Sequence, residues 1–318
     1  MRSMHPVVRA LVSTLTAKVN NLEKMSSRSL GKALYGLQGM SSNHPEIIDI
    51  LAALTVHLRT CDEIISPDEL SQLMVGMYGM SSDHVQVREF ISVLTTKMHD
   101  CKKEFSALNI SDIMYGLHRQ SNKRFEVRDF LSVLSSKIIK SEEDMAGFHL
   151  SKSLHGLNHM NSYNSEVRDI LMKFSVKIQN CKTDLTYFEI IDSIKGLHGM
   201  CSDHIEVRTL LASLLKHLKN AKLNMKITTK MKMKLSSQNI CDLLYGMNSM
   251  SVDHPEVCDT LSLLALLAYE NELSIISTTD LVLNTIGISK ESAVVKDFLY
   301  KFQKIEKNLH LTSNKKIG

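Results

Sequence analysis

Residues 34–46 read Leu-Tyr-Gly-Leu-Gln-Gly-Met-Ser-Ser-Asn-His-Pro-Glu, and similar stretches recur along the chain. The first glycine of this stretch, Gly36, returns as Gly76, Gly116, Gly156, Gly196 and Gly246, at spacings of 40, 40, 40, 40 and 50 residues. A fixed period in this range is typical of proteins built from stacked repeats. The sequence therefore predicts one elongated array rather than two or three ordinary domains.

Each unit has the apolar spacing of two amphipathic helices. In the first helix, apolar residues recur at offsets that place them on one helical face. In the first full unit they are Leu30, Ala33, Leu34, Leu37 and Met40. In the second helix of the next unit they are Val87, Phe90, Ile91, Leu94 and Met98. We therefore expect an all-α protein, a right-handed αα-solenoid of about seven two-helix repeats with a period of about 40 residues.

Two further signals concern where the helices begin and how closely they pack. Capping-box pairs predict that each second helix starts at the same place in its unit. These pairs are Asn43 and Glu46, Asp83 and Gln86, Asp203 and Glu206, and Asp253 and Glu256. The repeated glycine is expected inside the first helix, where it costs about 1 kcal/mol relative to Ala. We therefore expect Gly36 and its equivalents to lie where a neighbouring helix leaves no room for a Cβ.

Breaks in the period divide the chain into five segments. Residues 1–27 are expected to form the second helix of a truncated first repeat, because residues 5–9 match residues 84–88. Their basic composition, without an acid before Glu23, also fits an organelle presequence,. The other segments are regular repeats over 28–215, a basic spacer over 216–238, a last repeat plus a degenerate capping repeat over 239–305, and a basic tail over 306–318.

The composition excludes several classes of function. The formal net charge is only +4, and no apolar run approaches the roughly 18 residues that suggest a membrane span. The six cysteines include no Cys-x-x-Cys pair, so we expect no zinc and a reducing intracellular compartment, either the cytoplasm or a mitochondrion or plastid,. The chain has no Gly-rich phosphate loop and no nucleophile–base pattern. We therefore expect no enzymatic activity, no cofactor, no small-molecule substrate and no membrane contact.

Candidate binding residues recur at two positions of the first helix, those of Tyr35 and Gln38. We expect both positions to be exposed along one continuous face. Aromatic, His, Asn, Gln and Lys side chains there suit the stacking and hydrogen bonding of nucleobases, and no Glu, Asp or Ser occurs. The alternative is a polar helix flank that varies freely. The candidates for single-stranded RNA binding are Tyr35, Gln38, Tyr78, Tyr115, His118, His155, Asn158, Lys195, His198, Tyr245 and Asn248.

Two sets of basic residues are candidates for contacts with RNA phosphates. One set lies in the spacer, where a solvated loop is the alternative. The other set recurs in the second helix, where we favour a ladder of ion pairs with acids of the same or the adjacent unit, such as Glu126 or Asp129 for Arg128. The two sets are Lys226, Lys230, Lys232 and Lys234, and Arg88, Arg128, Arg168 and Arg208.

The unit pairs a small-apolar helix ending in Gly-x-x-Met with a second helix that opens on Pro-Glu. It resembles the octotricopeptide repeats and the heptatricopeptide-type repeats of FAST-kinase-like proteins, which implies binding of single-stranded RNA, in organellar RNA processing or stability. Residues 253–257, Asp-His-Pro-Glu-Val, also resemble the turn between the helices of HEAT repeats. That second resemblance implies a protein–protein interaction scaffold, which is the alternative function.

Overall fold

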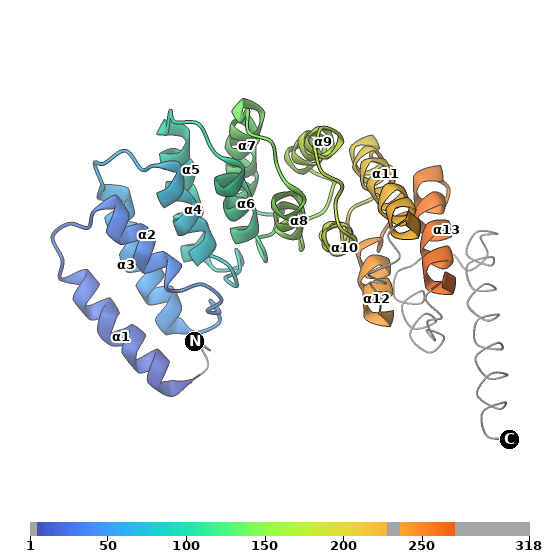
Figure 1. The fold of residues 1–318 in the computed structure, drawn as a ribbon. Coiled ribbons are helices and arrows are strands. Elements are labelled where there is room, and N and C mark those ends of the chain that lie inside the picture. The colour runs from blue at the N-terminus through green and yellow to red at the C-terminus, as the bar shows by residue number, and fades with distance from the viewer. Residues whose placement is uncertain (1–4, 228–235, 271–318) are drawn as a thin grey trace, which may run out of the picture.

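The computed structural model describes residues 5–227 and 236–270, and every regular element within these ranges is a helix (Figure 1). The predicted all-α class is confirmed. The first helices of the units are α2 (Ser27–Tyr35), α4 (Pro67–Gly76), α6 (Ala107–Gly116), α8 (Gly147–His155), α10 (Tyr187–Lys195) and α12 (Ser237–Gly246). The second helices are α3 (Pro45–Thr60), α5 (Val85–Asp100), α7 (Phe125–Lys140), α9 (Ser165–Gln179), α11 (Ile205–Ile227) and α13 (Pro255–Glu270). Helix α1 (Pro6–Asn20) precedes them.

Neighbouring helices pack in a regular alternating pattern. Each first helix packs against the first helix of the next unit, and each second helix packs against the next second helix. Helix α1 packs against α3 in the same way. Figure 1 shows the helices following one another in an arch, with α6, α8, α10 and α12 on its inner side and α7, α9, α11 and α13 on its outer side. One continuous apolar core runs through the array and includes fully buried Phe90, Phe130 and Phe174.

The repeated glycines lie where successive first helices touch. A Cβ on Gly116 would stand 2.0 Å from the backbone oxygen of Met74, and one on Gly76 would stand 2.2 Å from that of Leu34. Gly156, Gly196 and Gly246 meet the preceding first helix in the same way. Gly36 is the exception, because a Cβ there would approach only its own helix, at 3.4 Å or more. The predicted close approach is therefore confirmed at five positions and is wrong at Gly36.

The first helix is shorter than its apolar pattern predicts. Gly36 caps α2 instead of lying inside it, and residues 37–39 form a turn. The turn contains one residue in the left-handed region, which ends the helix. This residue is Gly39 (φ 75°), Gly79 (97°), Arg119 (73°), His159 (80°), Gly199 (83°) or Ser249 (74°). The apolar side chains at +7 and +10 are buried all the same, because the turn carries Leu37 and Met40 into the core.

The predicted capping boxes are wrong, because the second helices begin one residue later than expected. The N-caps of α3 and α5 are His44 and His84, without a side-chain cap bond. The Asp83 carboxylate instead accepts a hydrogen bond from the Ser81 hydroxyl within the turn, at 3.1 Å. Capping boxes occur at the first helices, with the pairs Ser66 and Glu69, Ser106 and Asn109, Thr186 and Glu189, and Ser236 and Asn239.

The basic spacer begins as a helix rather than as a loop. Helix α11 continues to Ile227 and has 23 residues, against 16 in α5 and in α7. The first part of the segment that breaks the 40-residue period therefore lengthens a second helix. Residues 228–235 of the spacer, and the predicted capping repeat and tail from residue 271 onward, lie outside the described residues.

Candidate nucleic-acid interface

A row of rings follows the C-terminal ends of the central first helices. The Tyr78 and Tyr115 rings are stacked, with centroids 4.3 Å apart and planes 5° apart. His118 stacks on Tyr78 at 5.0 Å and on His155 at 4.9 Å, and Tyr115 stacks on His155 at 5.9 Å. Each of these contacts joins one unit to the next. We call this set the ring row: Tyr78, Tyr115, His118 and His155.

A second stacked pair continues the same two repeat positions toward the C-terminus. The His198 and Tyr245 rings lie 3.9 Å apart with planes 4° apart, and a His198 ring nitrogen lies 3.0 Å from the Tyr245 backbone oxygen. Between this pair and the ring row lies Lys195, which forms an ion pair with Asp242 at 3.2 Å. The two repeat positions thus bring side chains of successive units together.

The predicted exposure of these side chains holds only in part. Tyr35, Gln38 and Tyr245 are exposed. Tyr78, Tyr115, His118, His155, Lys195, His198 and Asn248 are half-buried. Asn158 is buried, so its predicted position on an exposed face is wrong. For the half-buried aromatic and histidine residues, the physical reason is that the rings of successive units cover one another, and sequence periodicity does not report that contact.

The ring row has an environment that keeps its histidines neutral. Burial, with the nearby His155, His159 and Arg119, lowers the pKa of His118 to about 4. Burial also lowers the pKa of His155 and of His159, and it raises the pKa of Tyr115. A neutral imidazole carries one donor and one acceptor, so it can bond to the edge of a base. His118 Nδ1 and Asn158 Oδ1 are two of the several buried side-chain atoms in the described residues for which no hydrogen-bond partner is seen.

The arginines of the second helices have structural partners. Arg128 donates two hydrogen bonds to the backbone oxygens of Asn122 and Lys123, both at 3.1 Å, and its Nε lies 3.8 Å from Glu166 of the next unit. Arg88 and Arg168 bond in the same way and pair with Glu126 and Glu206. Arg208 bonds to the two matching turn oxygens. This bonding favours the ion-pair ladder over phosphate contact, although the partner of Arg128 is Glu166 rather than Glu126 or Asp129.

The spacer lysines are placed only in part. Lys226 lies in the last turn of α11, and Lys230, Lys232 and Lys234 lie outside the described residues. Earlier in the same helix, Lys219 lies 3.5 Å from Asp259 of α13. The prediction that the spacer contacts phosphates therefore stays a prediction.

Two exposed aromatic residues that the periodicity did not single out lie in the turns after the ring row. Phe125 begins α7 and Tyr163 lies just before α9, and their side chains are 67% and 72% exposed. The sequence feature that could have identified them is that their turns depart from the repeated turn sequence. Turns elsewhere contain Asn-His or Asp-His, whereas these two contain Lys123-Arg124 and Tyr163-Asn164.

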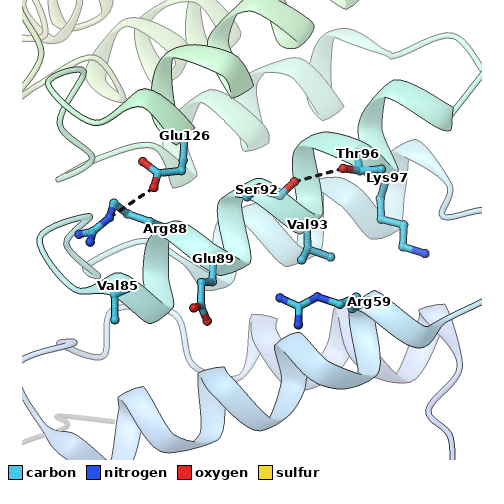
Figure 2. A pocket seen from close by; sticks show the side chains of 9 residues that line it. All are labelled: Arg59, Val85, Arg88, Glu89, Ser92, Val93, Thr96, Lys97 and Glu126. Atoms are coloured by element: carbon cyan, nitrogen blue, oxygen red, sulfur yellow. Dashed lines mark hydrogen bonds and ion pairs between the residues drawn. The ribbon is translucent and has the colours of Figure 1, made fainter.

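Three hollows of the described surface lie beside second helices. The groove in Figure 2 has a volume of about 420 Å³ and lies on α5, between α3 and α7. Its lining includes Arg59, Arg88, Glu89, Lys97 and Glu126. Arg88 pairs with Glu126 at 3.5 Å, and Lys97 donates to the Cys61 backbone oxygen at 2.6 Å. This ion pair and this hydrogen bond join adjacent units, so the groove lies at an interface where second helices pack together.

The described residues define an all-helical chain whose neighbouring helices pack in a regular pattern. No family model, curated protein or solved structure matches this chain. Within 5–227 and 236–270, no group of three or more His, Cys, Asp or Glu side chains could hold a metal ion. None of the helices described there is long and apolar enough to cross a membrane.

Proposed function

We propose that this chain is a non-enzymatic helical-repeat protein that binds single-stranded RNA along the face where its first helices end. The observation that carries the proposal is the ring row, continued by His198 and Tyr245, in which aromatic and imidazole side chains of successive units lie in contact. Such residues stack on bases or bond to their edges. The resemblance to octotricopeptide repeats adds organellar RNA processing or stability as the setting.

The stacking within the row limits how it can meet a base. Rings 4.3 Å apart leave no space for a base between them. We propose that the row offers its edges, with the neutral imidazoles of His118 and His155 as donors or acceptors, and that the buried Nδ1 of His118 takes no part in this contact. Tyr35 and Tyr245, which are exposed at the two ends of this face, offer ring surface for stacking, in Tyr245 only on the face that does not stack on His198.

We further propose that the array is a right-handed αα-solenoid of about seven two-helix repeats. The alternating contacts of first with first and second with second helices support it. A compact domain of 318 residues would have a radius of gyration of about 20 Å. Small-angle X-ray scattering should give a clearly larger value, and a value near 20 Å would contradict the solenoid.

Fluorescence anisotropy with labelled RNA tests the binding proposal. Single-stranded RNA of mixed sequence should bind, and duplex RNA should bind more weakly. Stacking contributes about 1–3 kcal/mol per base, so the double variant Tyr115→Ala, His118→Ala should lose affinity about tenfold or more. The loss should depend on the base offered, because these side chains would read bases rather than merely attract the strand.

The matched control for this double variant removes exposed rings at the other end of the first helices. The control, Phe148→Ala with Phe188→Ala, should leave RNA affinity unchanged, because these residues lie near the N-termini of α8 and α10. If the wild-type protein binds no single-stranded RNA, the proposal is wrong. Equal affinity of wild type and the Tyr115/His118 variant for every RNA would also contradict it.

A protein–protein scaffold of the HEAT type is the second candidate function. Leu108, Phe148 and Phe188 occupy the second position of three successive first helices, and each is 50% exposed. Three apolar side chains in register form a surface on which a protein helix could dock. On this hypothesis, a protein partner is first isolated with the wild type and then purified. The variant in which all three residues are changed to Gln should no longer bind this purified partner. Such a result with intact RNA affinity would assign this surface to a separate role.

A further inference from the structure

The turns joining α6 to α7 and α8 to α9 differ in sequence from the other turns. The other four turns place Asn or Asp and then His before the second helix, at residues 43–44, 83–84, 203–204 and 253–254. The two central turns carry Lys123-Arg124-Phe125 and Tyr163-Asn164 instead. They contain no acid from Arg119 to Phe125 or from His159 to Ser165. One of these two adjacent units thus carries Lys-Arg, and the other Tyr-Asn, where most other units carry an acid and a histidine. Phe125 stands where the other four turns are followed by Pro, Val or Ile.

The two aromatic side chains present surface that the protein itself leaves open. Phe125 is 67% exposed and Tyr163 is 72% exposed, in contrast to the half-buried ring row. Each ring has a cationic or aromatic side chain beside it. The Arg128 guanidinium lies 5.9 Å from the centroid of the Phe125 ring, and His204 meets the Tyr163 ring nearly at a right angle at 6.1 Å. Most of each side chain therefore remains available to a ligand.

Both turns are fixed by hydrogen bonds, and these bonds tie one turn to the other. The Asn122 side-chain amide donates to the backbone oxygen of Asn161 and to Oδ1 of Asn164, both at 2.8 Å. Arg128 bonds to the oxygens of Asn122 and Lys123, and Arg168 bonds to that of Tyr163 at 2.8 Å. Binding to such a surface loses less conformational entropy than binding to mobile loops.

Two cationic side chains, Arg119 and Lys123, lie in the turn that precedes Phe125. Arg119 and Lys123 are exposed. The charge of Arg119 lowers the pKa of both His118 and His159, so Arg119 lies beside the row. The nearby acids are engaged elsewhere, since Glu126 pairs with Arg88 and Glu166 with Arg128. Arg124 is also engaged, with Asp83 at 3.0 Å.

We propose that Arg119, Lys123, Phe125 and Tyr163, which we call the central patch, form the principal contact with single-stranded RNA. This inference rests on the proposed function and locates the contact within it. Unpaired bases stack on Phe125 and Tyr163, and the phosphates between them meet Arg119 and Lys123. The arrangement favours a single strand, because open rings on adjacent units need bases free of their own helical stacking.

The test separates the stacking residues from the charged residues. Phe125→Val with Tyr163→Asn introduces the residues that other turns carry at these places, Val85 and Asn43, so the fold is expected to tolerate them. Affinity for a mixed single-stranded RNA should fall at least tenfold with an unchanged salt dependence. Arg119→Gln with Lys123→Gln should instead reduce the slope of log affinity against log salt by about 1.4, because each phosphate that a side chain neutralises contributes about 0.7 to that slope.

A second readout locates the strand directly. RNA containing 4-thiouridine, cross-linked by long-wavelength light and analysed by mass spectrometry, should attach to peptides containing Phe125 or Tyr163. Thermal melting of each variant shows that the fold is retained, and Phe148→Val with Phe188→Asn serves as the matched control.

The outcomes distinguish the two levels of the proposal. If the wild type binds no single-stranded RNA, both the function and the central patch are wrong. If RNA binding depends on Tyr115 and His118 but both patch variants keep wild-type affinity and salt slope, the central patch alone is overturned. Cross-links confined to other turns would overturn it as well.

Discussion

At the scale of single residues, the tightest constraint is the contact between a glycine of one unit and the backbone of the previous unit. The distance between an added Cβ and that backbone oxygen lies between 1.8 and 2.2 Å at Gly76, Gly116, Gly156, Gly196 and Gly246. A backbone oxygen cannot move aside as the end of a flexible side chain can. These glycines therefore set how closely successive first helices approach.

Gly116→Leu should destabilise the protein, because its Cβ would lie 2.0 Å from the Met74 oxygen. Overpacking of this kind costs about 1–3 kcal/mol or more, and we expect the melting temperature to fall by several degrees. The matched control is Gly36→Ala, where a Cβ meets only its own helix and helix propensity favours Ala. Thermal melts compare the two. An unchanged melting curve for Gly116→Leu would refute the packing explanation.

The neutral His118 should make the stability of the protein depend on pH. Its pKa is lowered to about 4 in the folded protein, against about 6.5 in the unfolded chain. Between these values the unfolded state binds the additional proton. The stability that the neutral imidazole provides is therefore complete above about pH 6.5 and is lost as the pH falls toward 4.

The variant that tests this is His118→Gln, because the first unit carries Gln38 at the same repeat position. Urea unfolding at about pH 7.5 and about pH 5 should show wild type losing about 1 kcal/mol more than His118→Gln, once solvent screening is allowed for. Carboxylates elsewhere titrate equally in both proteins, so the difference isolates the imidazole. Parallel pH profiles for the two proteins would show that His118 is not responsible.

At the scale of the helices, the existence of each element was easier to predict than its boundaries. The two-helix unit followed from the apolar spacing, and the structure agrees for the described residues. The predicted end of the first helix was wrong because a residue in the left-handed backbone region, such as Arg119 or His159, ends it. Arg and His rarely adopt this conformation, so their presence in the sequence does not predict it. The predicted start of the second helix was wrong because the Asp83 carboxylate bonds within its own turn.

Features of the candidate site could be predicted only where they depend on the sequence of a single unit and not on contacts between units. The periodicity identified the positions of Tyr115 and His118, but it could not show that their rings stack on those of neighbouring units. The arginine ladder was predicted to pair with acids of the same or the adjacent unit, and the partner of Arg128 is Glu166 of the adjacent unit rather than Glu126 or Asp129. Periodicity identifies residues that obey the repeat, and it missed Phe125 and Tyr163 because they break it.

Arg128 should contribute to stability and not to contact with RNA phosphates. It holds the oxygens of Asn122 and Lys123 and pairs with Glu166. Hydrogen bonds from charged groups contribute about 1.5–3 kcal/mol, so Arg128→Met should lower the unfolding free energy by about 2 kcal/mol. The salt dependence of RNA affinity should be unchanged where the variant is folded. A reduced salt slope with normal stability would restore the phosphate-contact hypothesis for this arginine.

At the scale of the whole molecule, function depends on how a small net charge is distributed. The chain carries only +4 overall, so it has no uniform attraction for a polyanion. Ion pairs between units use many of the charges, including Lys152 with Asp112 and Lys195 with Asp242. Charge remains concentrated in the central turns and in the region from Lys216 to Lys234, which holds no acid. These two regions lie in different units of the array.

The spacer lysines should strengthen binding without selecting a sequence. Changing Lys226, Lys230 and Lys232 to Gln removes three charges from a segment with no acid between Glu206 and Asp242. Contacts with phosphates carry no base information, so affinity for all single-stranded RNAs should fall by a similar factor. The slope of log affinity against log salt should decrease by up to about 2, because each neutralised phosphate contributes about 0.7.

The Phe125→Val, Tyr163→Asn variant is the natural comparison for the spacer lysines, because it should lower affinity without changing that slope. Anisotropy titrations of several RNAs at low and high salt measure both effects. An unchanged affinity and slope in the lysine variant would mean that the spacer is solvated and that the central turns supply the phosphate contacts alone.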